Sequence, residues 1–189
     1  MLTQLLNENR AAILKEWFDL IINSYPSDTA RFLKKEKDRF QNPVGHTLHE
    51  ETGNLFDRLV AGDELGTMVP SVDNIVRIRA VQDFEPSQAV AVIFVLKQAV
   101  RVVLGPRIEE PERLRELLEF ESRIDRLGLA TFDCYVQCRE KIHEIRINEI
   151  KNRSSMLFER MQGHREEPVI NNETDNSNIV IRKKGGDGS

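Results

Sequence analysis

The stretch AVAVIFVLKQAVRVVL, residues 89–104, decides which fold class the chain adopts. Its first half fits a buried β-strand, because it is a short apolar run rich in β-branched residues. The second half carries the apolar pattern beyond the usual length of a strand, and Lys97 and Arg101 interrupt it. The apolar run is also too short to span a bilayer. We therefore predict a buried central helix in an all-α, single helical-bundle domain.

The residues before this stretch show helical spacing as well. Residues 2–25 place large apolar side chains, Trp17 among them, mostly three or four positions apart, with charged residues between them. Pro26 ends this helix, since the residue before a proline is pushed out of the helical region. A second, highly charged helix is expected to use Phe32, Leu33 and Phe40 as its apolar face.

The segment DRFQNPVGHTLHEE, residues 38–51, reads as a helix start. Asn42 is a good N-cap, and Pro43 fits the first helical position, where no backbone donor is needed. The third helix then runs to about Ala61. A fourth is predicted over 73–84, capped by Ser71 behind Pro70.

Residues 111–162 keep helical spacing almost throughout, with Gly128 as the one interior helix breaker. A single long helix and two helices joined end to end both fit. At about 1.5 Å per residue, a helix of roughly 50 residues exceeds the diameter of the domain. Its apolar side chains then need cover, either from the chain folding back or from a second copy in a dimer stem. The predicted stem residues are Tyr135, Ile142, Ile145, Ile150 and Leu157.

The last part of the chain differs in composition. Residues 163–189 are rich in Asn, Gly and charge, and we predict a disordered tail after a helical domain over 1–162. The short segment NIVI, 178–181, is the one piece of this tail suited to docking on a partner.

Charge and cysteine content exclude several classes of protein. A net charge of -4 gives no basic face for nucleic acid or anionic membranes, so neither partner is expected. Two cysteines are too few for the disulfide framework of a secreted protein. The N-terminus lacks the continuous apolar stretch of a signal peptide. We expect a cytoplasmic protein without a membrane span.

No catalytic motif stands out. The chain contains no glycine-rich phosphate loop, HExxH or GxSxG pattern, so we predict that it is not an enzyme and that it has no cofactor. His46 and His49 lie three apart beside Glu50 and resemble half of a metal site. Without a strong third ligand, two solvated histidines near a helix start are the favoured interpretation, and no metal is predicted.

Cys134 and Cys138 lie one helical turn apart and offer an alternative, a redox or cofactor-binding protein that also uses His143 or His46. A reactive thiol needs an electropositive, partly exposed setting. Buried cysteines more often behave as small hydrophobic residues, and we favour that interpretation.

Three segments resemble a known family. They are YPSDTARFLKKEKDRFQNPVGHTL (25–48), RIRAVQDFEPSQAVAVIFVLKQAV (77–100) and RIDRLGLATFDCYVQCREKIHEIRINE (123–149). Together they are similar to the N-terminal domain of RsbRD-type RsbT co-antagonists, over about residues 1–155. The combination of RFxNPVG and RAVQDFxPSQA is the most specific part of the likeness.

The resemblance implies a dimeric α-helical input module of stressosome-type signalling, with a non-haem globin-like fold as one form. In that family a C-terminal helix leads to a phosphorylatable STAS domain. No strand-alternating segment follows residue 162, so the resemblance implies a stand-alone sensory or protein-interaction module. We therefore predict a regulatory homodimer that acts on a signalling partner.

The polar residues of RAVQDFEPSQ allow two interpretations. Capping of the two helix ends explains them most simply. The functional alternative is a small polar ligand pocket. Its predicted residues are Trp17, Arg79, Gln82, Phe84 and Gln88.

Overall fold

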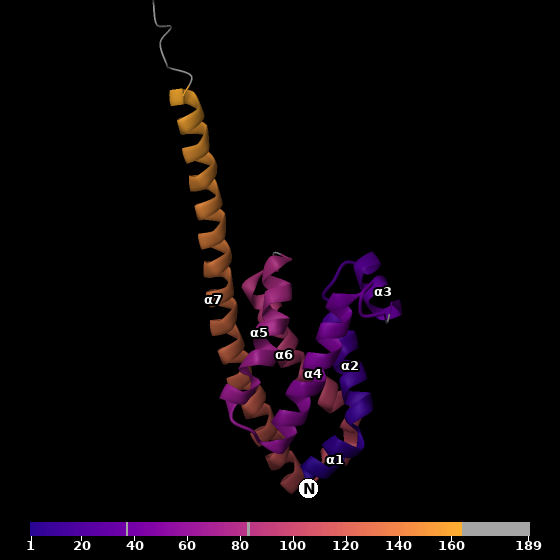
Figure 1. Ribbon diagram of the computed structural model, residues 1–189. Coiled ribbons are helices and arrows are strands. Elements are labelled where there is room, and N and C mark those ends of the chain that lie inside the picture. The colour runs from indigo at the N-terminus through magenta and orange to yellow at the C-terminus, as the bar shows by residue number, and fades with distance from the viewer. Residues whose placement is uncertain (37, 83, 164–189) are drawn as a thin grey trace, which may run out of the picture. The chain divides into compact units, whose positions relative to one another are not determined.

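The computed structural model describes residues 1–36, 38–82 and 84–163 of the chain. All regular elements in these ranges are helices, which confirms the all-α prediction (Figure 1). The elements are α1 (Leu2–Glu8), α2 (Arg10–Ile22), α3 (Ser27–Lys35), α4 (Pro43–Ala61), α5 (Leu65–Val81), α6 (Pro86–Leu104), the short 3-10 helix η1 (Gly105–Ile108) and α7 (Pro111–Gly163).

The chain divides into two compact units, residues 1–147 and 148–189. The first unit contains the helical bundle. The second is described over 148–163, which form the last part of α7. The predicted tail and its NIVI segment lie outside the described residues, except for Gly163, which ends α7.

The stretch that decides the fold forms α6, the central core helix. Its buried face packs against α2, where the Trp17 indole N–H donates to the Val92 carbonyl at 2.6 Å. By length and composition the whole of α6 is apolar enough to cross a membrane. One of its faces lies in the bundle core, and Lys97 and Arg101 pair with Asp125 and Glu121 of α7, so a core helix accounts for its composition.

Two predicted boundaries were wrong at the N-terminal side. The helix predicted over 2–25 is broken at Asn9, whose side-chain amide donates to the Leu5 carbonyl at 2.8 Å and so competes with regular helix geometry. The second helix, α3, ends at Lys35. Phe40 therefore lies outside it and is 93% exposed, instead of contributing to an apolar face.

The start of α5 also differs from the prediction. The helix begins at Leu65 and contains Pro70, so Ser71 is an interior residue and not a cap. Met68, in the first turns of α5, is fully buried in the core. Burial of this side chain stabilises the added turns.

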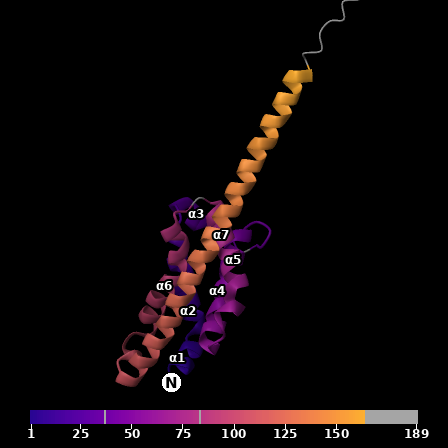
Figure 2. The same ribbon diagram turned by 90° about the vertical axis from the view of Figure 1, so that its left-hand side faces the viewer.

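Within the first unit α7 is one continuous helix through Gly128 and lies between α6 and α5 (Figure 2). A Cβ atom at position 128 would lie 2.2 Å from the Phe94 ring of α6. Gly128 therefore admits an aromatic ring and does not break the helix. The face of α7 that packs in the core consists of Leu117, Phe120, Ile124, Leu127 and Tyr135.

Candidate functional site

A buried arginine lies at the corner where α5 ends and α6 begins. Arg79 is in the last turn of α5 and is 0% exposed. One guanidinium nitrogen, Nη2, donates to Ser24 Oγ at 3.0 Å and to the Gln88 carbonyl at 3.2 Å. The other two nitrogens, Nε and Nη1, have no hydrogen-bond partner among the described residues. The site thus holds a buried cation with unused donors.

Two aromatic rings surround this guanidinium. Its carbon lies 3.9 Å from the centroid of the Phe84 ring and 5.3 Å from that of Tyr25, and the two rings meet edge to face. The Tyr25 hydroxyl donates to Gln82 Oε1 at 3.1 Å. Burial raises the pKa of the Tyr25 phenol, although the nearby Arg79 charge opposes this rise. Burial also lowers the pKa of Arg79.

The corner is bonded directly to α7. The Tyr135 hydroxyl donates to the Phe84 carbonyl at 2.6 Å, and Arg139 Nη1 donates to the Ala80 carbonyl at 3.2 Å. Phe84, which stacks on Arg79, therefore also accepts a hydrogen bond from α7. We call Ser24, Tyr25, Arg79, Gln82, Phe84 and Gln88 the Arg79 cluster.

Four of the five residues predicted for a ligand pocket belong to this cluster. Gln88 also has the capping role considered from the sequence, because its side chain accepts from the Glu85 amide at 3.3 Å. The fifth, Trp17, uses its indole N–H on Val92 of α6. Sequence reasoning did not include Tyr25 in the pocket, because it placed this residue only on the apolar face of the first helix, before Pro26.

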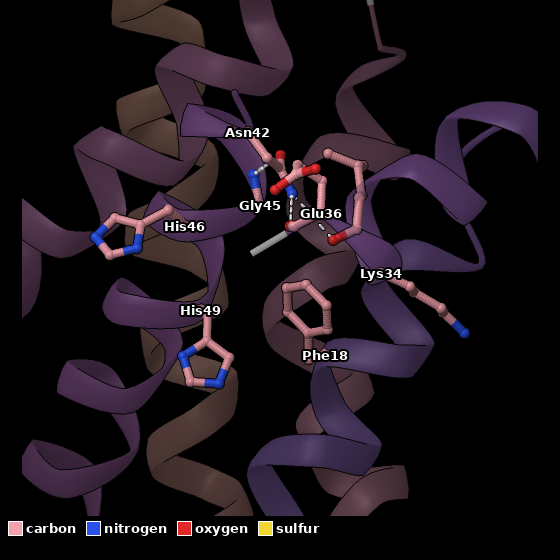
Figure 3. Close-up of a pocket in the computed structure, with 8 residues that line it drawn as sticks. Phe18, Lys34, Glu36, Asn42, Gly45, His46 and His49 are labelled. Carbon is pink, nitrogen blue, oxygen red and sulfur yellow. Dashed lines mark hydrogen bonds between the residues drawn. The ribbon is translucent and has the colours of Figure 1, made fainter. Parts of the chain in front are cut away.

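The two predicted histidines line a pocket of about 330 Å³ between α2, α3 and α4 (Figure 3). His46 Nε2 lies 3.5 Å from Glu50, and the His49 ring meets Phe18 edge to face. No group of three metal-ligating side chains occurs in the described part of the chain. The pocket is lined by Phe18, Leu33, Lys34, Glu36, Asn42, Gly45, His46 and His49.

Most polar groups of this pocket already have internal partners. Asn42 accepts from the Gly45 amide and donates to the Leu33 and Glu36 carbonyls. Lys34 pairs with Asp19 at 2.8 Å, and Figure 3 shows its side chain pointing away from the two imidazoles. The Asn42 amide and the Lys34 ammonium of this pocket are therefore already engaged within the chain.

Cys134 and Cys138 line a groove between α5 and α7 and are both partly buried. Burial and the neighbouring Asp73 carboxylate raise the pKa of both thiols. Arg77, Lys141 and Arg139 oppose the rise at Cys138 without cancelling it. The setting favours neutral thiols and so disfavours the redox alternative.

This setting predicts slow thiol chemistry. At pH 7 the folded chain should react with iodoacetamide more slowly than the unfolded chain, because a raised pKa leaves less thiolate at neutral pH. With rising pH, the folded rate should go on increasing beyond the ordinary thiol pKa of about 8.5, where the rate of the unfolded chain levels off. Mass spectrometry of timed samples gives the rates. Faster labelling of Cys134 or Cys138 in the folded chain at pH 7 would contradict this account.

An apolar stripe runs along the outer face of α7. Leu129 is 67% exposed, and Phe132 and Val136 follow at helical spacing on the same face. Leu118 precedes Phe132 by 14 residues, close to four helical turns, so it lies on that face as well. We call Leu114, Leu118, Leu129, Phe132 and Val136 the α7 stripe.

The residues predicted for a dimer stem fall into two groups. Tyr135 lies in the core and Ile142 packs partly against it, so neither belongs to an exposed stem. Helical spacing alone does not tell which of two apolar faces packs inside the bundle, so the dimer stem stays a prediction. Ile145, Ile150 and Leu157 are exposed.

Comparison with known proteins defines the class to which the chain belongs. The family of RsbT co-antagonist protein rsbRD N-terminal domains matches residues 11–150, which is well over half of the chain. The chain belongs to this family, as the sequence motifs predicted. No curated protein and no solved structure matches it. The family is a regulatory one and indicates a role in stress signalling.

Proposed function

We propose that this chain is a non-enzymatic regulatory module, cytoplasmic and homodimeric, that dimerises through α7 and acts on a partner protein. Its membership of a regulatory family supports the general role. The observation that carries the dimer is the α7 stripe, five large apolar side chains exposed on one helix face. Apolar surface gathered in this way usually marks an interaction site.

The neighbouring face of α6 adds to this surface. Phe94 and Val102 are exposed on α6, beside the ion pairs that join Lys97 to Asp125 and Arg101 to Glu121. Two helices with apolar outer faces favour a partner that is also helical, because a pair of such surfaces packs as a four-helix arrangement. A second copy of this chain supplies that partner without any further protein.

The sequence register extends the same pattern. Ile150 and Leu157 follow Val136 by 14 and 21 residues, which are multiples of seven, and both are exposed. A seven-residue apolar spacing is typical of helices that associate side by side. Ile150 and Leu157 therefore remain part of the proposed stem.

Sedimentation equilibrium of the full chain tests the dimer. We expect a molecular mass of twice the chain mass of 21.8 kDa at micromolar concentration. A single-chain mass at every accessible concentration would contradict the proposal. Purification of the tagged chain from its native cells then tests the second part, with a stoichiometric protein partner as the expected result.

A further inference from the structure

Three charged side chains are buried within the part of the chain that the structure describes, and two of them are compensated. Glu121 receives both ends of a bidentate contact from Arg101 at 2.6 Å. Glu51 accepts from Asn74 and Asn54. The third, Arg79, is the most deeply buried and contacts no carboxylate in any of the described ion pairs.

The aromatic rings compensate only part of this charge. The face of an aromatic ring attracts a guanidinium that stacks on it. The Phe84 ring makes this contact, with its centroid 3.9 Å from the guanidinium carbon of Arg79. The N–H bonds point outward in the plane of the guanidinium and need acceptors at its edges. Nη2 uses its two N–H bonds on Ser24 and Gln88. Among the described residues, no acceptor lies in hydrogen-bond geometry to the N–H bond of Nε or to the two N–H bonds of Nη1.

Buried polar groups without a partner are rare, and a buried charge without a counter-charge is rarer still. We propose that the free edges of Arg79, at Nε and Nη1, bind a small monovalent anion, either a halide or the carboxylate group of a small organic acid. The anion supplies both the negative charge and the missing acceptors.

The surroundings set the size of the ligand and its route. Phe84 and Tyr25 pack closely against the guanidinium, so only a small group reaches its edges. Ser24, Gln82 and Gln88 are exposed, which places the buried charge one layer below the surface. Their neutral side chains do not repel an anion on its way in.

The bond from Tyr135 to Phe84 connects this site to α7. An anion that orders Arg79 and Phe84 also orders the Phe84 carbonyl, which accepts the hydrogen bond from Tyr135 of α7. This link makes the site a means of regulating α7, and that part rests on the proposed function. Anion binding itself does not depend on it.

Thermal unfolding of the full chain at pH 7 tests the site. The sodium concentration is held constant with isethionate, a bulky sulfonate, and this anion is replaced stepwise by chloride in one series and by formate in another. We expect Tm to rise with the logarithm of the anion concentration once this exceeds the dissociation constant, by about 3–6 °C at ten times that constant. The chloride and formate series distinguish a halide site from a carboxylate site.

Arg79→Met should abolish the rise, because Met fills similar space without a donor. Arg77→Met is the matched control, since Arg77 lies on the same helix, is exposed and pairs with Asp73. It removes the same charge and should keep the full anion response. If Arg79→Met does not fold, chloride NMR line broadening by the wild-type chain, reversed by formate, gives the same answer.

A wild-type Tm that does not change with anion concentration in either series would overturn the proposal. An anion response that Arg79→Met retains would overturn it as well. Light scattering of the same samples reports the oligomeric state. A dimer whose Tm does not respond to the anion would contradict the anion site alone. A monomer whose Tm response depends on Arg79 would contradict the proposed dimer alone.

Discussion

Replacing both Leu129 and Phe132 with glutamate is expected to turn the dimer of the full chain into a folded monomer. Both side chains lie on the α7 stripe and are exposed in the single chain, so the change removes no core contact. In a dimer it would bury four carboxylates without partners. We expect the dimer dissociation constant to rise about 100-fold or more, as measured by sedimentation equilibrium.

Val81→Glu is the control for this experiment. Val81 is as exposed as Leu129 but lies on α5, away from the α7 stripe. It should leave the dissociation constant unchanged, and circular dichroism should show the same helix content in all variants. Dissociation by Val81→Glu, or a double variant that stays dimeric, would mean that another surface joins the copies.

The second large effect is expected at the start of α4. Asn42→Ala should lower the free energy of unfolding by about 2–4 kcal/mol, because it removes an N-cap and leaves buried carbonyls without donors. Asn42 is only 2% exposed and makes three hydrogen bonds, one to Gly45 and one each to Leu33 and Glu36. Urea unfolding followed by circular dichroism measures the change.

Two further variants separate the parts of this effect. Asn42→Asp keeps the acceptor for the Gly45 amide but loses both donors, so it should fall between wild type and Asn42→Ala. Asn54→Ala, on the exposed side of the same helix, removes one contact with Glu51 and should change stability by less than about 0.5 kcal/mol. Equal losses for Asn42→Ala and Asn54→Ala would contradict the assigned role of Asn42.

The elements that could be predicted from the sequence have strong local signals. The start of α4 follows from Asn42 and Pro43, which act through neighbouring backbone groups. The length of α6 follows from an apolar pattern too long for a strand. In both cases the physical cause lies within a few residues of the element itself.

The boundaries that were wrong depend on contacts made elsewhere in the chain. The first turns of α5 are stabilised by Met68 in the core, which overrides the break expected at Pro70. The exposure of Phe40 follows from where α3 ends. Such tertiary effects leave no local pattern.

The candidate sites divide in the same way. The motif around Arg79 drew attention to the correct corner, but Tyr25 joins it from 54 positions earlier in the chain, which no spacing rule predicts. The α7 stripe, by contrast, has a signal that sequence reasoning overlooked. Leu129, Phe132 and Val136 repeat at helical spacing on a face separate from that of Tyr135.

One measurement tests most directly whether two copies meet through the α7 stripe. Cys134 and Cys138 are replaced by serine, and a single spin label is attached at Asp133→Cys, an exposed position beside Phe132. Pulsed electron resonance of the full chain should then give one short, narrow distance between labels, and the Leu129 and Phe132 glutamate variant should lose it. A labelled wild-type chain that shows only background decay would contradict the account.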